Sequence, residues 1–186
     1  MTRKRGVGLL VGACAVGAGI WVCAIQGLAA GGPKELTPAA SAAVKGRFPA
    51  GSIVAVSQER EGGVRYFEVA VQDGPRRVEI EVTAEGTIGE IESVVALDDL
   101  PQAVRDAIRT LTAGGSVEVV ERHEVRGEPW GGAFVPVEPA RIFYEVKSRM
   151  DGALREFAIG PDGKALPAEG DDDDDGADDD DDGEVG

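Results

Sequence analysis

The segment LDDLPQAVRDAIRTL, residues 97–111, predicts an amphipathic helix in the middle of the chain. Asp99 is the expected N-cap, Gln102 the residue that returns a bond to it, and Pro101 stands in the first turn, where a missing N–H costs nothing. Such a helix is only marginally stable alone and needs an apolar surface to pack on. Its own apolar side chains recur at intervals of three and four, as one face of a helix requires: Leu100, Val104, Ala107, Ile108 and Leu111.

Short segments of alternating polarity flank this helix and predict antiparallel strands. Glu79 and Glu81 alternate with apolar residues, so we expect them on a solvated strand face without a catalytic role. Asp73-Gly74 is a strong hairpin turn signal. In chain order, the sequence predicts a first helix over 38–44, strands near 52–58, 64–72, 78–82 and 87–95, the central helix, and further strands near 117–121, 142–149 and 154–159.

The order of these elements recurs, which predicts an internal repeat. Gly51-Ser52 corresponds to Gly115-Ser116, Asp73-Gly74 to Asp151-Gly152, and Tyr66-Phe67-Glu68-Val69 to Phe143-Tyr144-Glu145-Val146. We therefore predict an α+β fold built from two α-β-β-β(-β) units, each a helix packed on an antiparallel sheet. The first unit covers residues 31–96 and the second residues 97–168.

Short turn and core motifs recur along both predicted units. They are Thr37-Pro38, Phe48-Pro49-Ala50-Gly51-Ser52-Ile53, Tyr66-Phe67-Glu68-Val69, Asp73-Gly74, Glu85-Gly86, Leu100-Pro101-Gln102-Ala103-Val104, Tyr144-Glu145-Val146 and Asp162-Gly163-Lys164. Together these motifs resemble the PepSY-like family of small extracytoplasmic bacterial domains. The resemblance covers residues 36–167 as two tandem copies, and it implies a relationship in shape to propeptides of secreted metallopeptidases and to β-lactamase inhibitor proteins. It also implies an envelope location and a binding or inhibitory role, without catalytic residues.

Residues 1–30 have the three parts of an export signal: a basic start, an uncharged apolar run, and small residues before a cleavage point. Cleavage after Ala29 gives a mature chain that begins at residue 30. The run from Gly6 to Ile25 also has nearly the length of a membrane span, which leaves retention as an anchor open. A third alternative is lipidation at Cys14. Each alternative places the rest of the chain outside the cytoplasm, with membrane contact only through this segment.

The segment from Arg126 to Ala140 interrupts the second unit and predicts a long loop with a recognition role. Trp130, Phe134 and Glu128 are its expected partner-binding residues, because aromatic side chains dominate binding energy at interfaces. The alternative is that Trp130 and Phe134 fold back and cover a sheet edge or one end of the core.

The composition argues against several kinds of function. His123 is the single histidine, so we expect an ordinary surface side chain and neither a histidine-based metal site nor a Ser-His-Asp relay. Both cysteines lie before residue 31, and no nucleophile motif occurs, so we predict that the protein is not an enzyme and needs no cofactor. The net charge of −15 makes nucleic acid an unfavourable partner.

The last segment, residues 169–186, carries 12 acidic residues and no basic one, which predicts a disordered polyanion. Loose Ca2+ association with alternate carboxylates is the metal binding that such a run allows. Those carboxylates are Asp171, Asp173, Asp175, Asp178, Asp180 and Asp182.

Two hypotheses follow from the sequence. The leading one is a non-catalytic extracytoplasmic module that binds an envelope protein or peptide, with a peptidase inhibitor or regulator as its specific form. The alternative is a structural envelope protein whose tail binds Ca2+ or cationic surfaces.

Overall fold

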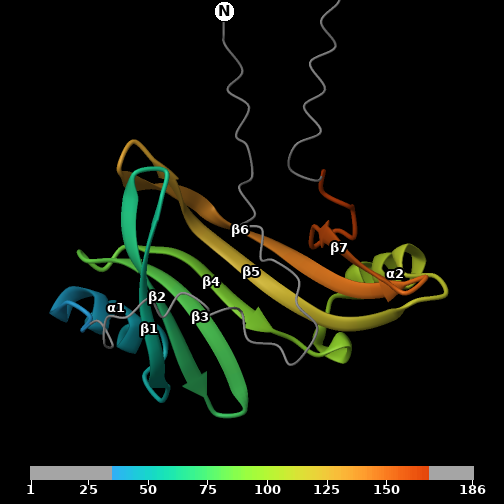
Figure 1. Ribbon diagram of the computed structural model, residues 1–186, viewed down its shortest axis with the longest axis horizontal. Coiled ribbons are helices and arrows are strands. Elements are labelled where there is room, and N and C mark those ends of the chain that lie inside the picture. Colours follow the sequence, from blue (N-terminus) through green and yellow to red (C-terminus); the bar gives the residue numbers. More distant parts are fainter. Residues whose placement is uncertain (1–34, 168–186) are drawn as a thin grey trace, which may run out of the picture.

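A computed structural model describes residues 35–167 of the chain, in which seven antiparallel strands form one sheet in sequential order (Figure 1). The predicted elements are present, and several strands are longer than the sequence indicated. The elements are α1 (Pro38–Arg47), β1 (Ser52–Glu61), β2 (Val64–Asp73), β3 (Arg76–Thr83), β4 (Ile88–Val94), a 3-10 turn (Leu97–Asp99), α2 (Gln102–Leu111), β5 (Ser116–Trp130), β6 (Ala133–Met150) and β7 (Ala153–Ile159).

Both helices pack on the same face of this sheet, each over its own half. Ala40 and Val44 of α1 are buried against β2, β3 and β4, whereas Val104 and Ile108 of α2 are buried against β5, β6 and β7. Since β4 pairs with β5, the two halves are joined into one sheet and not into two separate ones. The α+β class is confirmed, while the division into two duplicated units stays a prediction.

The two helices occupy corresponding positions in their halves. A side chain at Gly86 would place its Cβ 2.9 Å from the carbonyl oxygen of Ala39, and one at Gly163 would lie 2.6 Å from that of Ala103. Both glycines have positive φ, and both alanines are the second residue of their helix. The same helix-to-turn contact therefore occurs in each half, as the predicted repeat requires.

The predicted N-cap of α2 is wrong. Asp99 belongs to the 3-10 turn, and α2 begins after Pro101 without any side-chain cap. Leu100 precedes a proline and is therefore restricted to an extended backbone, which places its side chain in the core, 4% exposed. Gln102 donates to the carboxylate of Asp106 at 2.9 Å. By contrast, Thr37 caps α1 as its hydroxyl accepts from the N–H of Ala40 at 3.1 Å.

The segment from Arg126 to Ala140 is not a loop but the outer half of the long β5–β6 hairpin. Its strands pair from Gly127↔Pro136 to Trp130↔Ala133, with two glycines at the turn. The sequence insertion is absorbed where the register shifts between Val125 and Gly127. This hairpin crosses the molecule and brings its tip beside the β1–β2 turn, where Gly62 lies close to Pro129 (Figure 1). Neither helix within residues 35–167 is long and apolar enough to cross a membrane.

Candidate functional site: the acidic face of the sheet

The face of the sheet opposite the helices carries a row of glutamates, which we call the acidic face. The strand register places them together because directly paired residues share a face. Ala70 pairs with Glu79, Glu79 with Glu92, and Glu92 with His123. By the same register and strand alternation, the acidic face comprises Glu68, Glu79, Glu81, Glu90, Glu92, Glu121 and Glu145, together with His123 and Lys147.

Three pairs of glutamates stand directly opposite one another on this face. They are Glu68↔Glu81, Glu79↔Glu92 and Glu121↔Glu145. Like charges in directly opposed positions destabilise a sheet, so this arrangement lowers stability where neutral polar residues would not. A feature that a fold keeps at the expense of its own stability marks a candidate functional surface.

The glutamates of this face are far less solvated than strand alternation suggested. Glu121 and Glu145 are 4% and 8% exposed, and Glu79 has only 12% of its side chain exposed. The prediction of a solvated face at Glu79 and Glu81 is therefore wrong. The sheet is strongly twisted, and its long β5–β6 hairpin returns toward the β1–β2 end, so this face is partly enclosed (Figure 1).

Burial and mutual repulsion favour the protonated form of these carboxyls. Burial raises the pKa of Glu81 to about 8, and the charges of Glu90 and Glu61 add to the effect. Burial, followed by the charge of Glu79, raises the pKa of Glu68 to about 7. The acidic face thus carries several carboxyls that titrate between pH 4.5 and 8.

Lys147 is one of the cations that partly compensate this charge. Its ammonium lies 2.9 Å from a carboxylate oxygen of Glu145 and 3.2 Å from one of Glu121. Burial raises the pKa of Glu121 to about 7 even though Lys147 and His123 favour its charged form. One lysine bridging two buried carboxylates lowers their repulsion without removing it.

His123 occupies the centre of the acidic face and is 6% exposed, so the prediction of an ordinary surface histidine is wrong. Its ring stacks on Phe143 with centroids 4.4 Å apart, and its Nδ1 lies 2.8 Å from a carboxylate oxygen of Glu90. Burial by itself would lower the pKa of His123, but the hydrogen bond to Glu90 and the charge of Glu92 raise it to about 9. The second ring nitrogen, Nε2, is buried and has no hydrogen-bond partner.

This arrangement differs from a catalytic relay. Neither nitrogen of His123 bonds a hydroxyl group, so the hydroxyl–imidazole contact that a Ser-His-Asp relay needs is missing from residues 35–167. A hollow of about 210 Å³ opens beside the cluster, lined by Arg77, Glu79, Glu92, Val94 and Glu121. It is smaller than the usual pocket for an organic ligand, so an ion or a side chain of a partner suits it better.

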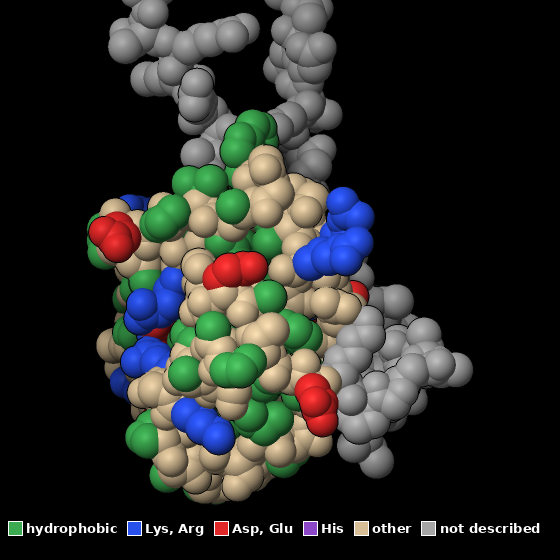
Figure 2. Space-filling view, turned by 90° about the vertical axis from the view of Figure 1, so that its left-hand side faces the viewer, with side chains coloured by type: hydrophobic (Ala, Val, Ile, Leu, Met, Phe, Trp, Pro, Cys, Tyr) green, Lys and Arg blue, Asp and Glu red, His purple; other side chains and the backbone are tan. Residues whose placement is uncertain are grey.

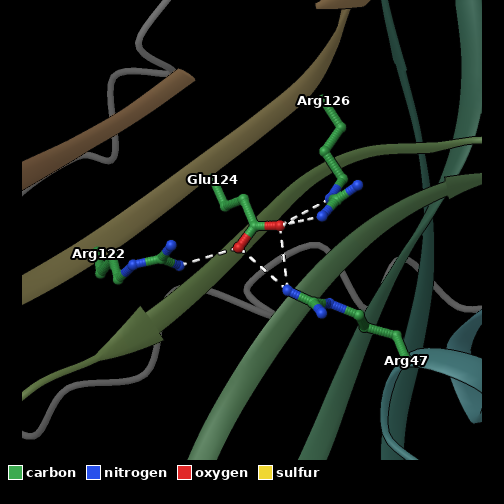
Figure 3. Close-up of polar contacts among 4 residues, drawn as sticks. All are labelled: Arg47, Arg122, Glu124 and Arg126. Atoms are coloured by element: carbon green, nitrogen blue, oxygen red, sulfur yellow. Dashed lines mark hydrogen bonds and ion pairs between the residues drawn. The ribbon is translucent and has the colours of Figure 1, made fainter. Parts of the chain in front are cut away.

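On the helix-covered face, Glu124 is surrounded by cations and not by other carboxylates. This buried carboxylate accepts from Arg47 of α1 at 3.1 Å, from Arg122 at 3.1 Å and from Arg126 at 2.7 Å (Figure 3). Burial alone would raise the pKa of Glu124, but the hydrogen bonds of Arg126 and Arg122 and the charge of Arg47 lower it. This cluster joins α1 to β5 and so ties the first half of the molecule to the second.

The three residues predicted to bind a partner have three different environments. Trp130 is 77% exposed at the tip of the β5–β6 hairpin. Phe134 is 7% exposed and packs against Tyr66 with ring centroids 5.7 Å apart, so it belongs to the core, as the alternative interpretation expected. Glu128 forms an ion pair with Arg141 at 2.7 Å across the same hairpin. The aspartates predicted to bind Ca2+ all lie outside the described residues.

Sequence reasoning missed the cluster of Glu121, His123, Glu145 and Lys147. The available signal was the pattern Glu-x-His in one strand beside Glu-x-Lys in the next, but only the register puts the two patterns side by side. The end of the molecule that carries α1 looks different: Figure 2 shows apolar side chains mixed with scattered basic ones and few acidic ones. Acidic side chains are therefore few on that end, whereas seven glutamates share the acidic face.

No protein-family model matches the sequence, and no curated protein matches it significantly. Several solved structures share the fold. A BLIP-like protein from Bacteroides fragilis NCTC 9343 is 21% identical, with a TM-score of 0.55 over 73% of this chain and 86% of that one. A DUF2874 family protein from Bacteroides uniformis ATCC 8492 is 14% identical, with a TM-score of 0.56 over 72% and 88%. A protein from Bacteroides eggerthii DSM 20697, provisionally classed as periplasmic, is 12% identical, with a TM-score of 0.56 over 72% and 88%.

Proposed function

We propose that this chain, which has the fold of BLIP-like and DUF2874 family proteins, is a non-catalytic extracytoplasmic module that binds a protein or peptide through the tip of its β5–β6 hairpin and the adjoining acidic face. The export-type leader and the provisional periplasmic class of one structural neighbour support the location. The exposure of Trp130 is the observation that carries the binding role.

The hairpin presents Trp130 in a fixed position. Behind the tip, the ring of Phe134 fills the space over Gly89, where a Cβ would lie 2.5 Å from its Cζ, and contacts Tyr66. The hairpin is therefore anchored in the core four residues after its exposed tryptophan. An anchored strand pair loses little conformational entropy on binding, so the burial of an indole ring contributes nearly fully to affinity.

The charge of the acidic face favours a basic partner. Its glutamates are compensated by Lys147 and by Arg77, which lies 3.3 Å from Glu79. A lysine or arginine of a partner in the hollow beside Glu79 and Glu92 would relieve the remaining repulsion. A secreted peptidase is the partner class that the PepSY-like resemblance implies. Binding of this kind should weaken as the salt concentration rises.

The test compares Trp130→Ala with Val54→Ala, a truncation of another exposed apolar residue that is 55% exposed on β1. We expect Trp130→Ala to weaken the binding of a partner from an envelope extract by about 2 kcal/mol or more, which is roughly thirtyfold in Kd. The melting temperature of this variant should stay within about 1 °C of that of the wild type. Val54→Ala should retain the partner. Equal losses of binding and of stability in Trp130→Ala would show that this side chain supports the fold instead.

Deletion of residues 169–186 separates this proposal from the tail-centred alternative. A module that binds through its hairpin and acidic face keeps its partner after the deletion. A structural protein that acts through its polyanionic tail loses it. The measurement is retention of the same partner by the full chain and by the shortened chain at one salt concentration.

A further inference from the structure

The imidazole of His123 has an arrangement that a surface for protein binding does not require. Its side chain is 7% exposed, and Nε2 is buried without a hydrogen-bond partner. A buried nitrogen without a hydrogen-bond partner destabilises the fold. Among the described residues this is the one ring nitrogen left in that state, and acidic side chains surround it.

Because Nδ1 of His123 is already hydrogen-bonded to Glu90, Nε2 is the ring nitrogen that can bind a ligand. Nδ1 lies 2.8 Å from a carboxylate oxygen of Glu90, and the ring is held flat against Phe143. A hydrogen bond from Nδ1 to a carboxylate is the usual way in which proteins orient a metal-binding histidine, and it leaves Nε2 as the atom that a metal ion binds by displacing its proton. Glu90 is therefore a positioning residue for His123.

The carboxylates of Glu121 and Glu145 lie close to this imidazole. Glu121, His123 and Glu145 each offer a ligand atom, and these atoms lie within 4.8 Å of one another. Ligands around a tetrahedral zinc ion lie roughly 3.3 Å apart, a consequence of bond lengths near 2.0–2.1 Å. Moderate torsional changes in the two glutamate side chains cover that difference, since their carboxylates come from adjacent strands that are already paired.

We propose that His123, Glu121 and Glu145 bind a divalent transition-metal ion of the zinc class on the acidic face. An imidazole nitrogen together with two carboxylate oxygens suits Zn2+ and its neighbours, whereas Ca2+ and Mg2+ prefer sites made of oxygen alone. The ion would replace the contacts that the ammonium of Lys147 makes with Glu121 and Glu145. Its double charge would also relieve the repulsion of the directly opposed glutamates.

The single histidine makes a direct test possible in the full-length protein. With 15N-labelled histidine, titration of Zn2+ should shift the Nε2 resonance and leave Nδ1 protonated, with saturation at one equivalent per imidazole. Zn2+ bound only by carboxylates leaves the Nε2 resonance unchanged, so this signal separates binding at the imidazole from binding elsewhere. An imidazole spectrum that does not respond to Zn2+, or a metal that appears on Nδ1, overturns the proposal.

Variants then identify the ligands. His123→Gln and Glu145→Gln should each weaken Zn2+ binding by roughly tenfold or more, and Glu90→Gln by a smaller factor, because it acts through His123. Glu85→Gln, an exposed residue in the β3–β4 turn, is the control and should bind Zn2+ as the wild type does. Ca2+ in tenfold excess should not displace Zn2+ from the imidazole. Zn2+ affinity in His123→Gln equal to that of Glu85→Gln would refute the assignment, and the wild-type imidazole spectrum remains decisive if His123→Gln fails to fold.

Discussion

Glu121 and Glu124 lie three residues apart on β5, are equally buried at 4% and 5% exposed, and point to opposite faces of one sheet. Three arginines surround Glu124 and lower its pKa. Glu121 faces another glutamate, with Lys147 as its nearest cation, and its pKa is raised to about 7. A similar exposed fraction therefore does not fix the charge state of a carboxyl, because the cations around it also determine its pKa.

This difference separates the roles of the two faces. On the helix-covered face the buried charge is fully paired and joins α1 to β5 (Figure 3). On the acidic face the carboxyls are in excess, which weakens the fold and leaves unused capacity to bind a cation. One face is built for stability, and the other is available for an ionic partner.

The largest predicted effect of the excess carboxyls is a dependence of protein stability on pH. Glu81 and Glu68 have folded-state pKa values of about 8 and 7, above the ordinary 4.5, so the folded protein binds more protons than the unfolded chain between pH 4.5 and 8. Stability is then fully present below pH 4.5 from these groups and is lost as the pH rises through 7 and 8. We expect the free energy of unfolding to fall by roughly 4 kcal/mol from pH 5 to pH 8.5.

Urea denaturation in a chelating buffer at the two pH values measures this loss. High salt at pH 8.5 should restore part of it, because salt screens the repulsion between partly buried glutamates. A protein that is equally stable at both pH values, or more stable at pH 8.5, would contradict the assigned excess of carboxyls.

The second prediction addresses the paired face. Glu124→Gln keeps the shape of the side chain but leaves Arg47, Arg122 and Arg126 close together without their common carboxylate. We expect a loss of about 2–3 kcal/mol at pH 7, because the buried carboxylate compensates three arginines whose side chains are 32–44% exposed and therefore partly solvated. Glu118→Gln is the matched control, as Glu118 pairs with Arg149 where 40% of its side chain is exposed. This control should change stability by about 0.5 kcal/mol or less in urea denaturation.

The sequence could predict the elements but not the enclosure of the sheet. Spacing located α1, α2 and the strand cores, because apolar periodicity and turn residues such as Gly74 and Gly152 are local signals. Alternation at Glu79 and Glu81 correctly separated two faces. It could not show that the second face is also partly covered, because the twist of the sheet and the return of the long hairpin depend on contacts distant in sequence.

The candidate site could not be predicted either, because its residues also come together only through contacts distant in sequence. His123 looked ordinary because its partners Glu90 and Glu145 come from other strands, and only the register of β4, β5 and β6 brings them together. The hairpin looked like a loop because it is rich in proline and glycine, which usually interrupt strands. Pro129 and Pro136 nevertheless take part in the strand pairing, whereas Pro139 falls in the register shift between Val125 and Gly127. For Trp130 the sequence left two alternatives open, an exposed recognition residue or a side chain folded back on the sheet, and the structure exposes it.

The last predicted effect distinguishes the two faces directly. Loss of a carboxylate from the acidic face should increase stability, whereas loss of Glu124 should decrease it. Glu81→Gln removes one buried negative charge beside Glu90 and Glu68, and the new amide oxygen can still accept from the hydroxyl of Tyr66. At pH 8.5 we expect an increase of about 2 kcal/mol in the free energy of unfolding, which is the share of Glu81 in the pH-dependent loss, and at pH 5, where Glu81 is protonated, almost no change. Glu85→Gln is the control, because Glu85 is exposed in the β3–β4 turn. Its free energy of unfolding should differ from that of the wild type by about 0.5 kcal/mol or less at both pH values. A loss of stability in Glu81→Gln at pH 8.5 would mean that the carboxylate is a paired structural charge like that of Glu124, and the contrast between the two faces would no longer hold.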